Sequence, residues 1–345
     1  MNNGMGRLLR IAIVGICLLL MPHLAHGAGS TWRFVVMGDT RDRTMNTLTG
    51  ISPDLSKMAE AIAAERPDLV IHTGDLCNGY YTTKETPMHG RFREMFRNWK
   101  AAVKPIYDYD NKKGIPLYPV RGNHEDGELI TNPELKKAYE EEIASFLPQN
   151  GPEGEKGLTY RVTHKGAEFI ALDEYADKKA AVVRGYVNQR WLNDEFARDK
   201  QPFVFVYCHT PAYKVGNYHQ SPFPNLYSHP EHRDALWKSF KMAGVSAYFC
   251  GHIHFYCRGA IDGIEQIVIG NGGADTVVFD AKKVEKAVEI HYPRVPYMSA
   301  ADVQTGYAVI TVDEHAGVAT GVQKVLNNKT GKWEEGDTFT LKARK

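Results

Sequence analysis

Two short stretches near the start of the chain share one pattern, and this pattern decides the fold. Residues 33–37 read RFVVM and lead into Gly38-Asp39, while residues 68–72 read DLVIH and lead into Thr73-Gly74-Asp75. Apolar runs of this length, bounded by small polar residues, predict buried strands. We therefore expect each of these strands to deliver an aspartate at its carboxyl end.

The same pattern recurs downstream, with helical segments between the strands. The runs and the residues that follow them are residues 115–120 (IPLYPV) before Arg121-Gly122-Asn123-His124-Glu125, residues 168–172 (EFIAL) before Asp173, residues 203–207 (FVFVY) before Cys208-His209-Thr210-Pro211, and residues 245–249 (VSAYF) before Gly251-His252-Ile253-His254. Helices are predicted over residues 54–65, 89–103 and 188–197. Alternating strands and helices predict an α/β fold in which ligands collect at the carboxyl ends of the strands. We expect five strand ends to converge on one site.

The C-terminal part of the chain has a different pattern. Residues 306–313, 317–325 and 338–341 read as strands separated by turns, with no strong helix among them. We expect this mostly β part, from about residue 274, to form a second sheet packed on the first. Residues 28–345 are thus predicted to form a single domain, a length that one large α/β domain can fill.

The first 27 residues predict a secretory signal peptide. Arg7 and Arg10 precede the apolar run at residues 11–21, and Ala25 and Gly27 are small residues suited to cleavage before Ala28. The run is too short for a membrane anchor, because a spanning helix needs about 20 residues. We expect a periplasmic or secreted protein with no membrane anchor after cleavage.

Composition and charge narrow the class of protein further. Hydrophobic residues make up 43% of the chain and charged residues 24%, which is typical of a globular protein. Lys and Arg number 42 against 41 Asp and Glu, so charge gives no reason to expect nucleic acid as a partner. After the signal peptide four cysteines remain, and three complete disulfide pairings are open. Of the pairs, Cys250 with Cys257 is favoured. The cysteines are Cys77, Cys208, Cys250 and Cys257.

The polar residues at the strand ends are candidate metal ligands. They are Asp39, Asp75, Asn123, His209, His252 and His254. Each residue alone could be a turn residue, a helix cap or a solvated histidine. Together they are oxygen and imidazole donors of the kind that bind Zn, Mn and Fe, and six donors can hold two metals. Paired metals are used by phosphatases to activate a water and to bind the transferring phosphoryl group.

The ordered motifs G-D, G-D, G-N-H-E, H-T-P and G-H-I-H resemble the calcineurin-like metallophosphoesterase family over roughly residues 33–273. The resemblance implies a four-layer α/β/β/α sandwich of two mixed β-sheets flanked by helices. It implies that Asp75 bridges two metals, that Asn123, His209 and His252 complete one site, and that Asp39 and His254 serve the other. His124 would be the general acid.

A finer resemblance, to purple acid phosphatases and their bacterial relatives, rests on the segments around residues 189–192, 203–213 and 251–254 and on the glycine-rich residues 269–273. It favours a phosphomonoesterase over a diesterase, with a small phosphoester as substrate. Two positions depart from the family. Arg41 stands where the usual Asp-x-His motif has its histidine, and Asn78 where purple acid phosphatases often have a tyrosine. A guanidinium cannot be a metal ligand because it stays protonated.

Arg41 therefore has two open interpretations: a contact to substrate phosphate, or a salt bridge outside the reaction. His219, in the long loop between Ala212 and His232, is a second candidate for substrate binding. The identity of the two transition metals, among Fe, Mn and Zn, is left open. The sequence thus predicts an exported metal-dependent phosphomonoesterase in which the metals activate a hydroxide. The alternatives are a phosphodiesterase or nucleotidase on the same scaffold, and a non-catalytic metal or phosphate binder.

Overall fold

Two mixed six-stranded sheets form the centre of the computed structural model, which describes residues 31–79, 82–126, 132–175, 184–213, 225–274 and 304–344. The first sheet has the order β14-β13-β12-β1-β2-β5, with β1, β2 and β5 parallel and the other three strands added antiparallel beside β1. Its strands are β1 (Thr31–Met37), β2 (Leu69–His72), β5 (Leu117–Pro119), β12 (Gly306–Asp313), β13 (Val318–Leu326) and β14 (Trp333–Lys342).

The second sheet has the order β10-β11-β9-β8-β7-β6. Its four inner strands are parallel, and an antiparallel strand lies at each edge. Its strands are β6 (Tyr160–His164), β7 (Ala167–Ala171), β8 (Phe203–Tyr207), β9 (Ala247–Cys250), β10 (Tyr256–Ile261) and β11 (Ile264–Ile269). A separate small hairpin pairs β3 (Tyr107–Asp108) with β4 (Lys113–Gly114).

Strand β8 shows why the second sheet lies in the middle of a sandwich. All five of its side chains are buried, and they alternate between two hydrophobic clusters because successive side chains of a strand point to opposite faces. Phe205 belongs to the cluster between the two sheets, where its ring lies 4.8 Å from that of Phe34 in β1. Val204 and Val206 belong to the cluster on the other face, together with Trp237 and Phe240 of α6. Both faces of the sheet are therefore covered.

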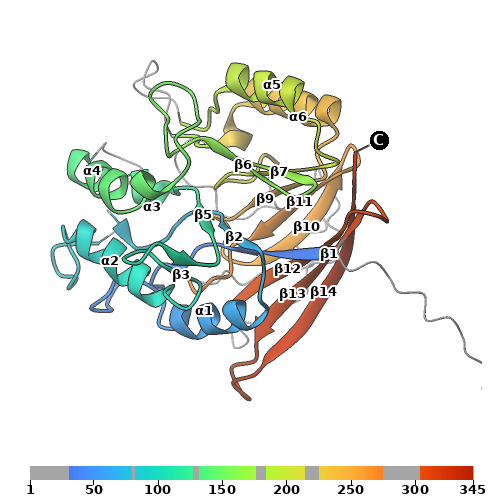
Figure 1. Ribbon diagram of the computed structural model, residues 1–345. Helices are drawn as coiled ribbons and strands as arrows, with labels where there is room; N and C mark the ends of the chain where they lie inside the picture. The colour runs from blue at the N-terminus through green and yellow to red at the C-terminus, as the bar shows by residue number, and fades with distance from the viewer. Residues whose placement is uncertain are drawn as a thin grey trace, which may run out of the picture.

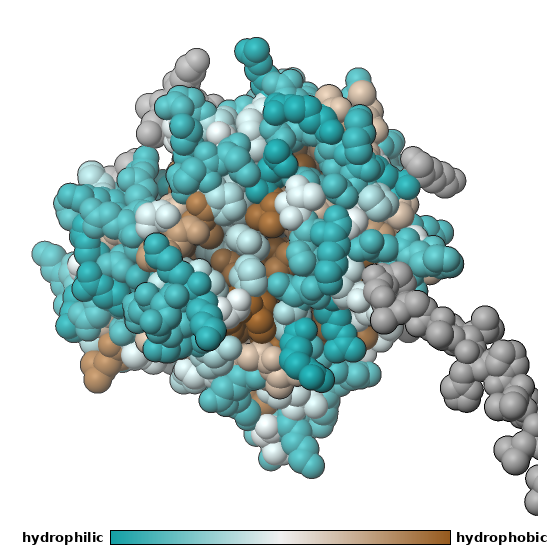
Figure 2. All heavy atoms as spheres, viewed as in Figure 1, coloured by the Kyte–Doolittle hydropathy of each residue, from teal (hydrophilic) through white to brown (hydrophobic). Residues whose placement is uncertain are grey.

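Helices form the two outer layers (Figure 1). Beside the first sheet lie α1 (Leu55–Ala64), α2 (Phe92–Ala102), the short α3 (Asn123–Asp126) and α4 (Pro133–Glu142); beside the second lie α5 (Gln189–Arg198) and α6 (Pro230–Ala243). Helix α1 buries Leu55, Met58, Ala59 and Ile62, the spacing of one helical face. The expected four-layer α/β/β/α sandwich is confirmed. The periphery of the face shown in Figure 2 is mainly hydrophilic, and hydrophobic residues are visible mostly in its middle.

The C-terminal strands differ from the expectation. They do not form a second sheet of their own but extend the first one, because β12 pairs with β1 over residues 308–313. The second sheet is built instead from β6 to β11, of which the hairpin β10–β11 was not predicted. Helix α6 begins at Pro230, so it shortens the loop expected between Ala212 and His232.

The prediction that a disulfide joins Cys250 and Cys257 is wrong. All four cysteines after residue 30 are free and buried. Cys250 in β9 and Cys257 in β10 are both in register with Val268 of β11, one on each side of it. Two strand spacings amount to roughly 9–10 Å, whereas a disulfide needs α-carbons within about 7 Å. The order of the strands therefore forbids the bond.

The predicted signal peptide and His219 lie outside the described residues. Within the described ranges no helix is both long and apolar enough to cross a bilayer.

Candidate metal centre

The carboxyl ends of strands from both sheets meet at one place. Asp39 follows β1, Asp75 follows β2, His209 follows β8 and His252 follows β9, while Asn123 begins α3 after β5. The structure brings the predicted ligands of both sheets into hydrogen-bonding or ion-pair distance of one another. Asp39, Asp75 and His209 each offer a ligand atom, and these three atoms lie within 4.8 Å of one another.

The backbone at this place is held in an uncommon conformation. Asp39, Asp75 and His252 have positive φ angles of 55°, 56° and 67°, a region that few residues other than glycine adopt. Such strained residues gather at functional sites, where the surrounding structure compensates for their cost. Here the N–H of His252 donates to the carboxylate of Asp39 at 3.0 Å, and the N–H of His124 donates to Oδ1 of Asp75 at 3.1 Å.

Lack of space explains why glycines precede two of the predicted ligands, Asn123 and His252. A Cβ on Gly122 would collide with the Asp75 carboxylate, and a Cβ on Gly251 would collide with the Asp39 carboxylate. The G-N-H and G-H-I-H motifs therefore keep space for aspartates that come from other strands.

One half of the centre consists of donors that point at one another. Oδ1 of Asn123 lies 2.9 Å from Nε2 of His209 and 2.9 Å from Nδ1 of His252, and these two nitrogens are 3.2 Å apart. Oδ1 of Asp75 lies 3.3 Å from Nε2 of His209. The other ring nitrogen of His209, Nδ1, lies 2.8 Å from the carbonyl of Thr73. That contact assigns the proton to Nδ1 and leaves the Nε2 lone pair for a metal.

The ionisation of this half also suits a metal. Burial lowers the pKa of His209 and of His252 to about 3, so both rings are neutral near pH 7. Neutral imidazole is the form that binds metals. Burial raises the pKa of Asp75 to about 6, although Arg41 opposes this rise. Burial and the charge of Asp75 also raise the pKa of Asp39. Two buried carboxylates without enough positive charge nearby are what a bound cation would stabilise. The residues present therefore fit a transition-metal centre.

The other half of the centre contains Asp39, His254 and Arg41. Nε2 of His254 lies 3.6 Å from Oδ1 of Asp39. Nη2 of Arg41 lies 3.4 Å from the same nitrogen of His254, and Nε of Arg41 lies 4.0 Å from Oδ2 of Asp75. Arg41 is only 6% exposed, so it is part of the centre and not a surface salt bridge.

His124 lies beside the same carboxylate. Its Nε2 is 3.8 Å from Oδ2 of Asp75, and its Nδ1 lies 2.9 Å from the carbonyl of Asn78. Burial and the charge of Arg41 lower the pKa of His124 well below its usual value. The negative charge of a bound phosphate would act in the opposite direction and favour the protonated ring.

Sequence reasoning missed the residues that hold the ligand loops. The carboxylate of Glu125 accepts hydrogen bonds from four backbone N–H groups, those of Asp75, Leu76, Cys77 and Gly122, at 2.7–3.2 Å. Glu174 accepts from the backbone and the hydroxyl of Thr210, next to His209. The only sequence signal for the role of Glu125 is its position directly after Asn123-His124. Nothing in the sequence indicates the role of Glu174, because its partner Thr210 is far away along the chain.

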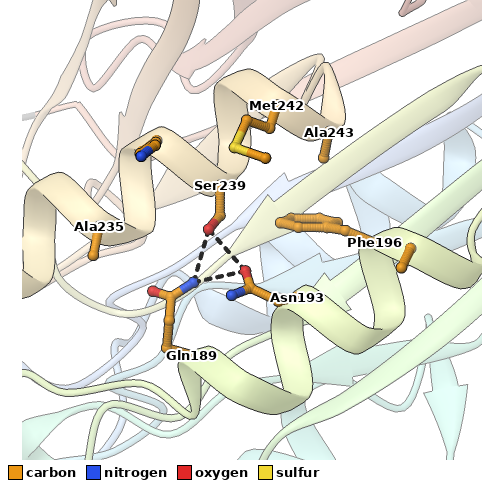
Figure 3. A pocket seen from close by; sticks show the side chains of 9 residues that line it. Gln189, Asn193, Phe196, Ala235, Ser239, Met242 and Ala243 are labelled. Carbon is orange, nitrogen blue, oxygen red and sulfur yellow. Dashed lines mark hydrogen bonds between the residues drawn. The ribbon is translucent and has the colours of Figure 1, made fainter.

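A groove elsewhere on the molecule is separate from this centre. It lies between α5 and α6 on the outer face of the second sheet and has a volume of about 550 Å³ (Figure 3). Its polar side chains Gln189, Asn193 and Ser239 hydrogen-bond to one another. None of the predicted site residues lines it.

A two-sheet α/β sandwich with paired aspartates, an asparagine and histidines at its strand ends defines a metallophosphoesterase. The chain belongs to the calcineurin-like phosphoesterase family, whose model matches residues 33–256. It is a phosphoester hydrolase. The prediction of transition-metal cofactors is confirmed, because this class of enzyme uses them and a group of candidate metal ligands is present.

Individual relatives agree with this assignment. Tartrate-resistant acid phosphatase type 5 of Homo sapiens is 21% identical over 337 residues, which cover 90% of this chain and 93% of that protein. The same phosphatase of Rattus norvegicus is 23% identical, over 71% of this chain and 73% of its own. Among solved structures, GAP50, the anchor in the inner membrane complex of Plasmodium, has a TM-score of 0.51 at 17% identity, covering 92% of this chain and 90% of its own. The last likeness concerns the fold alone.

Proposed function

We propose that the chain is an exported phosphatase that hydrolyses phosphomonoesters. The observation that carries this proposal is the convergence on Asp75 of donors from both sheets, with Arg41 and His124 both within 4.0 Å of its carboxylate. A site with metal ligands, a guanidinium and an imidazole side by side has the groups needed to bind a phosphate and to protonate a leaving oxygen. The relatives named acid phosphatases support the choice of monoesters.

The residues of the centre divide between metal binding, phosphate binding and proton transfer. Asp75, Asn123, His209 and His252 would hold one metal, and Asp39 and His254, together with Asp75, would hold the other. When bound, the metals would supply Lewis-acid stabilisation of the phosphoryl oxygens and a lower pKa for a bound water. The planar guanidinium of Arg41 contacts a phosphoryl oxygen. Nε2 of His124 gives a proton to the leaving oxygen, while Nδ1 keeps its contact with Asn78 so that the ring stays oriented.

Hydrolysis of an aryl phosphate and of the matching diaryl phosphate by the metal-loaded protein tests the substrate class. We expect the monoester to be turned over faster, and faster turnover of the diester would favour the phosphodiesterase alternative. His124→Ala should lower kcat about 10²- to 10⁴-fold for a phosphate with a poor leaving group, and less for nitrophenyl phosphate, whose leaving oxygen needs no proton. The exposed His315 provides the control variant, His315→Ala, which should leave both rates unchanged.

Export rests on the N-terminal sequence, and the mature chain should begin at or near Ala28. Mass spectrometry of the soluble protein from the periplasm or medium checks this. Protein that keeps Met1 and stays in the cytoplasm would contradict it.

A further inference from the structure

The guanidinium of Arg41 lies in the second half of the metal centre. Its Nη2 is 3.4 Å from Nε2 of His254, and its Nε is 4.0 Å from Oδ2 of Asp75. Nε2 of His254 in turn lies 3.6 Å from Oδ1 of Asp39. The positive charge of the side chain therefore stands among the atoms that would bind the second metal.

Few hydrogen bonds hold this guanidinium where it is. Nη1 donates to the carbonyl of Asp42 at 3.3 Å, while Nε is buried and has no hydrogen-bond partner among the described residues. A buried charge is costly unless it is paired. The two buried carboxylates of Asp39 and Asp75 provide the opposite charge, so the side chain is held by charge and not by a dedicated set of acceptors. Such a side chain can leave when another cation takes its place.

Among the described residues, no cationic side chain makes a hydrogen bond to the ligands of the first half of the centre. There the amide oxygen of Asn123 and the ring nitrogens of His209 and His252 lie 2.9–3.2 Å from one another. These groups are uncharged, so a metal that binds here does not have to displace a cationic side chain from them. The two halves share Asp75 but differ in what a metal must displace.

We propose that Arg41 is an internal counter-cation that competes with the second metal ion. The position of Asn123, His209 and His252 fills first and tightly. The position of Asp39 and His254 fills only when the guanidinium moves away from His254 and Asp75, because a divalent ion and a guanidinium in one buried site repel each other strongly. In the form with two metals, the displaced guanidinium is the one that contacts the phosphoryl oxygen in the proposed function. The two metals therefore bind in sequence and with unequal affinity.

Metal titration tests this without any measurement of activity. Metal-free protein is titrated with Zn²⁺ by calorimetry, and the ions retained after dialysis are counted by elemental analysis. We expect the unmodified protein to bind one Zn²⁺ per chain tightly and a second at least tenfold more weakly. Arg41→His removes the charge and adds a donor, so it should retain two ions. Arg41→Lys keeps the positive charge and should still retain one.

Arg258 provides a matched control. It is also a partly buried arginine between two carboxylates, with Asp337 at 2.6 Å and Glu265 at 3.6 Å, and these link β10 to β14 and β11. Arg258→His should leave the number and affinity of the bound ions unchanged. Two equally tight ions in the unmodified protein, or one ion in Arg41→His, would overturn the proposal.

Thermal unfolding gives a second measurement that does not depend on the histidine variant. Arg41→Gln removes the charge at similar size. It should lower the Tm of the metal-free protein more than the Tm of the fully loaded protein, in which the second metal neutralises the carboxylates instead. An equal loss in both forms would mean that Arg41 has only a packing role, and would refute the competition.

Discussion

Asp75 is the residue on which both halves of the metal centre depend. Its Oδ1 faces His209, and its Oδ2 faces His124 and Arg41. The carboxylate of Asp39 lies 3.6 Å from Nε2 of His254 and accepts a hydrogen bond from the backbone N–H, not the ring, of His252. The two aspartates have the same local sequence, Gly-Asp after an apolar run, so only their place in the sheet separates their roles.

Asp75→Ala should therefore remove both metal ions, whereas Asp39→Ala should weaken one and be partly restored by excess metal. Elemental analysis after dialysis measures this directly. The control is Asp262→Ala, since Asp262 is exposed and pairs with Lys241 on the surface. Equal metal content in Asp75→Ala and the unmodified protein would show that this carboxylate is not a ligand.

His72 gives a prediction about pH. It is fully buried, the N–H of Gly74 donates to its Nδ1 at 3.1 Å, and its Nε2 lies 3.0 Å from the hydroxyl of Thr40. A proton on Nδ1 would face the N–H of Gly74, and burial lowers the pKa of this ring to about 3. The unfolded chain keeps the ordinary pKa of about 6.5. Between these values the unfolded state binds a proton that the folded state does not, so stability falls as pH falls.

Compared with His72→Asn, the unmodified protein should lose about 1.4 kcal/mol of stability per pH unit below about pH 6.5. Urea unfolding of both metal-free proteins at several pH values measures the difference. His209 and His252 are present in both proteins, so their contribution cancels. A difference that does not change with pH would show that His72 is protonated in the folded state.

At the scale of elements, the short helix α3 fixes the loop that follows β2. Its Glu125 accepts from the N–H groups of Asp75, Leu76, Cys77 and Gly122. The side-chain amide of a glutamine offers one acceptor atom in place of two. Glu125→Gln should therefore leave at least one buried N–H without a partner, at a cost of about 1–3 kcal/mol, and should weaken metal binding because Asp75 is no longer held.

Glu155 separates these two effects. It is also buried, but its carboxylate accepts from the side chains of Thr159 and Asn188, neither of which is a predicted metal ligand. Glu155→Gln should lower stability and keep the metal affinity of the unmodified protein. Unchanged metal affinity in Glu125→Gln would show that Glu125 supports the fold without positioning Asp75.

The elements also show what the sequence could predict. Each predicted ligand comes shortly after an apolar run, and a glycine directly precedes Asp39, Asp75, Asn123 and His252, whereas His209 follows its strand after Cys208 without one. The strand and the free space needed at its end are local features, so the sequence could reveal these ligands. The order of strands leaves no such local feature. For this reason the sequence did not predict β12 beside β1. It also did not predict that β11 lies between Cys250 and Cys257, which are close in sequence. The role of Glu174 depends on Thr210, 36 residues away, and was equally hidden.

At the scale of the molecule, the metal centre is a junction between the two sheets. Asp39, Asp75 and Asn123 follow strands of the first sheet, and His209, His252 and His254 follow strands of the second. Away from the centre, the sheets are held together by a layer of aromatic rings. Phe34 of β1 lies 4.9 Å from the ring of Phe169 and 4.8 Å from that of Phe205. We therefore expect the spacing of the ligands to depend on these aromatic rings, although none of them is a ligand.

Phe34→Ala tests this dependence. Deleting a buried phenylalanine costs about 3–5 kcal/mol, and here the cavity would open between the sheets. We expect metal affinity to fall together with stability, since the two sets of ligands are no longer held at one distance. Calorimetric titration with Zn²⁺, at a temperature where the variant is folded, measures this.

Phe240→Ala provides the comparison. Phe240 of α6 is also fully buried, but it packs between the second sheet and its outer helices, against Trp237 and Tyr248. Its deletion should cost a similar amount of stability and leave all ligands in place, so its metal affinity should remain that of the unmodified protein. If both variants lose affinity equally, metal binding follows global stability and not the distance between the sheets. If neither does, the ligand loops hold the centre together without help from the aromatic layer.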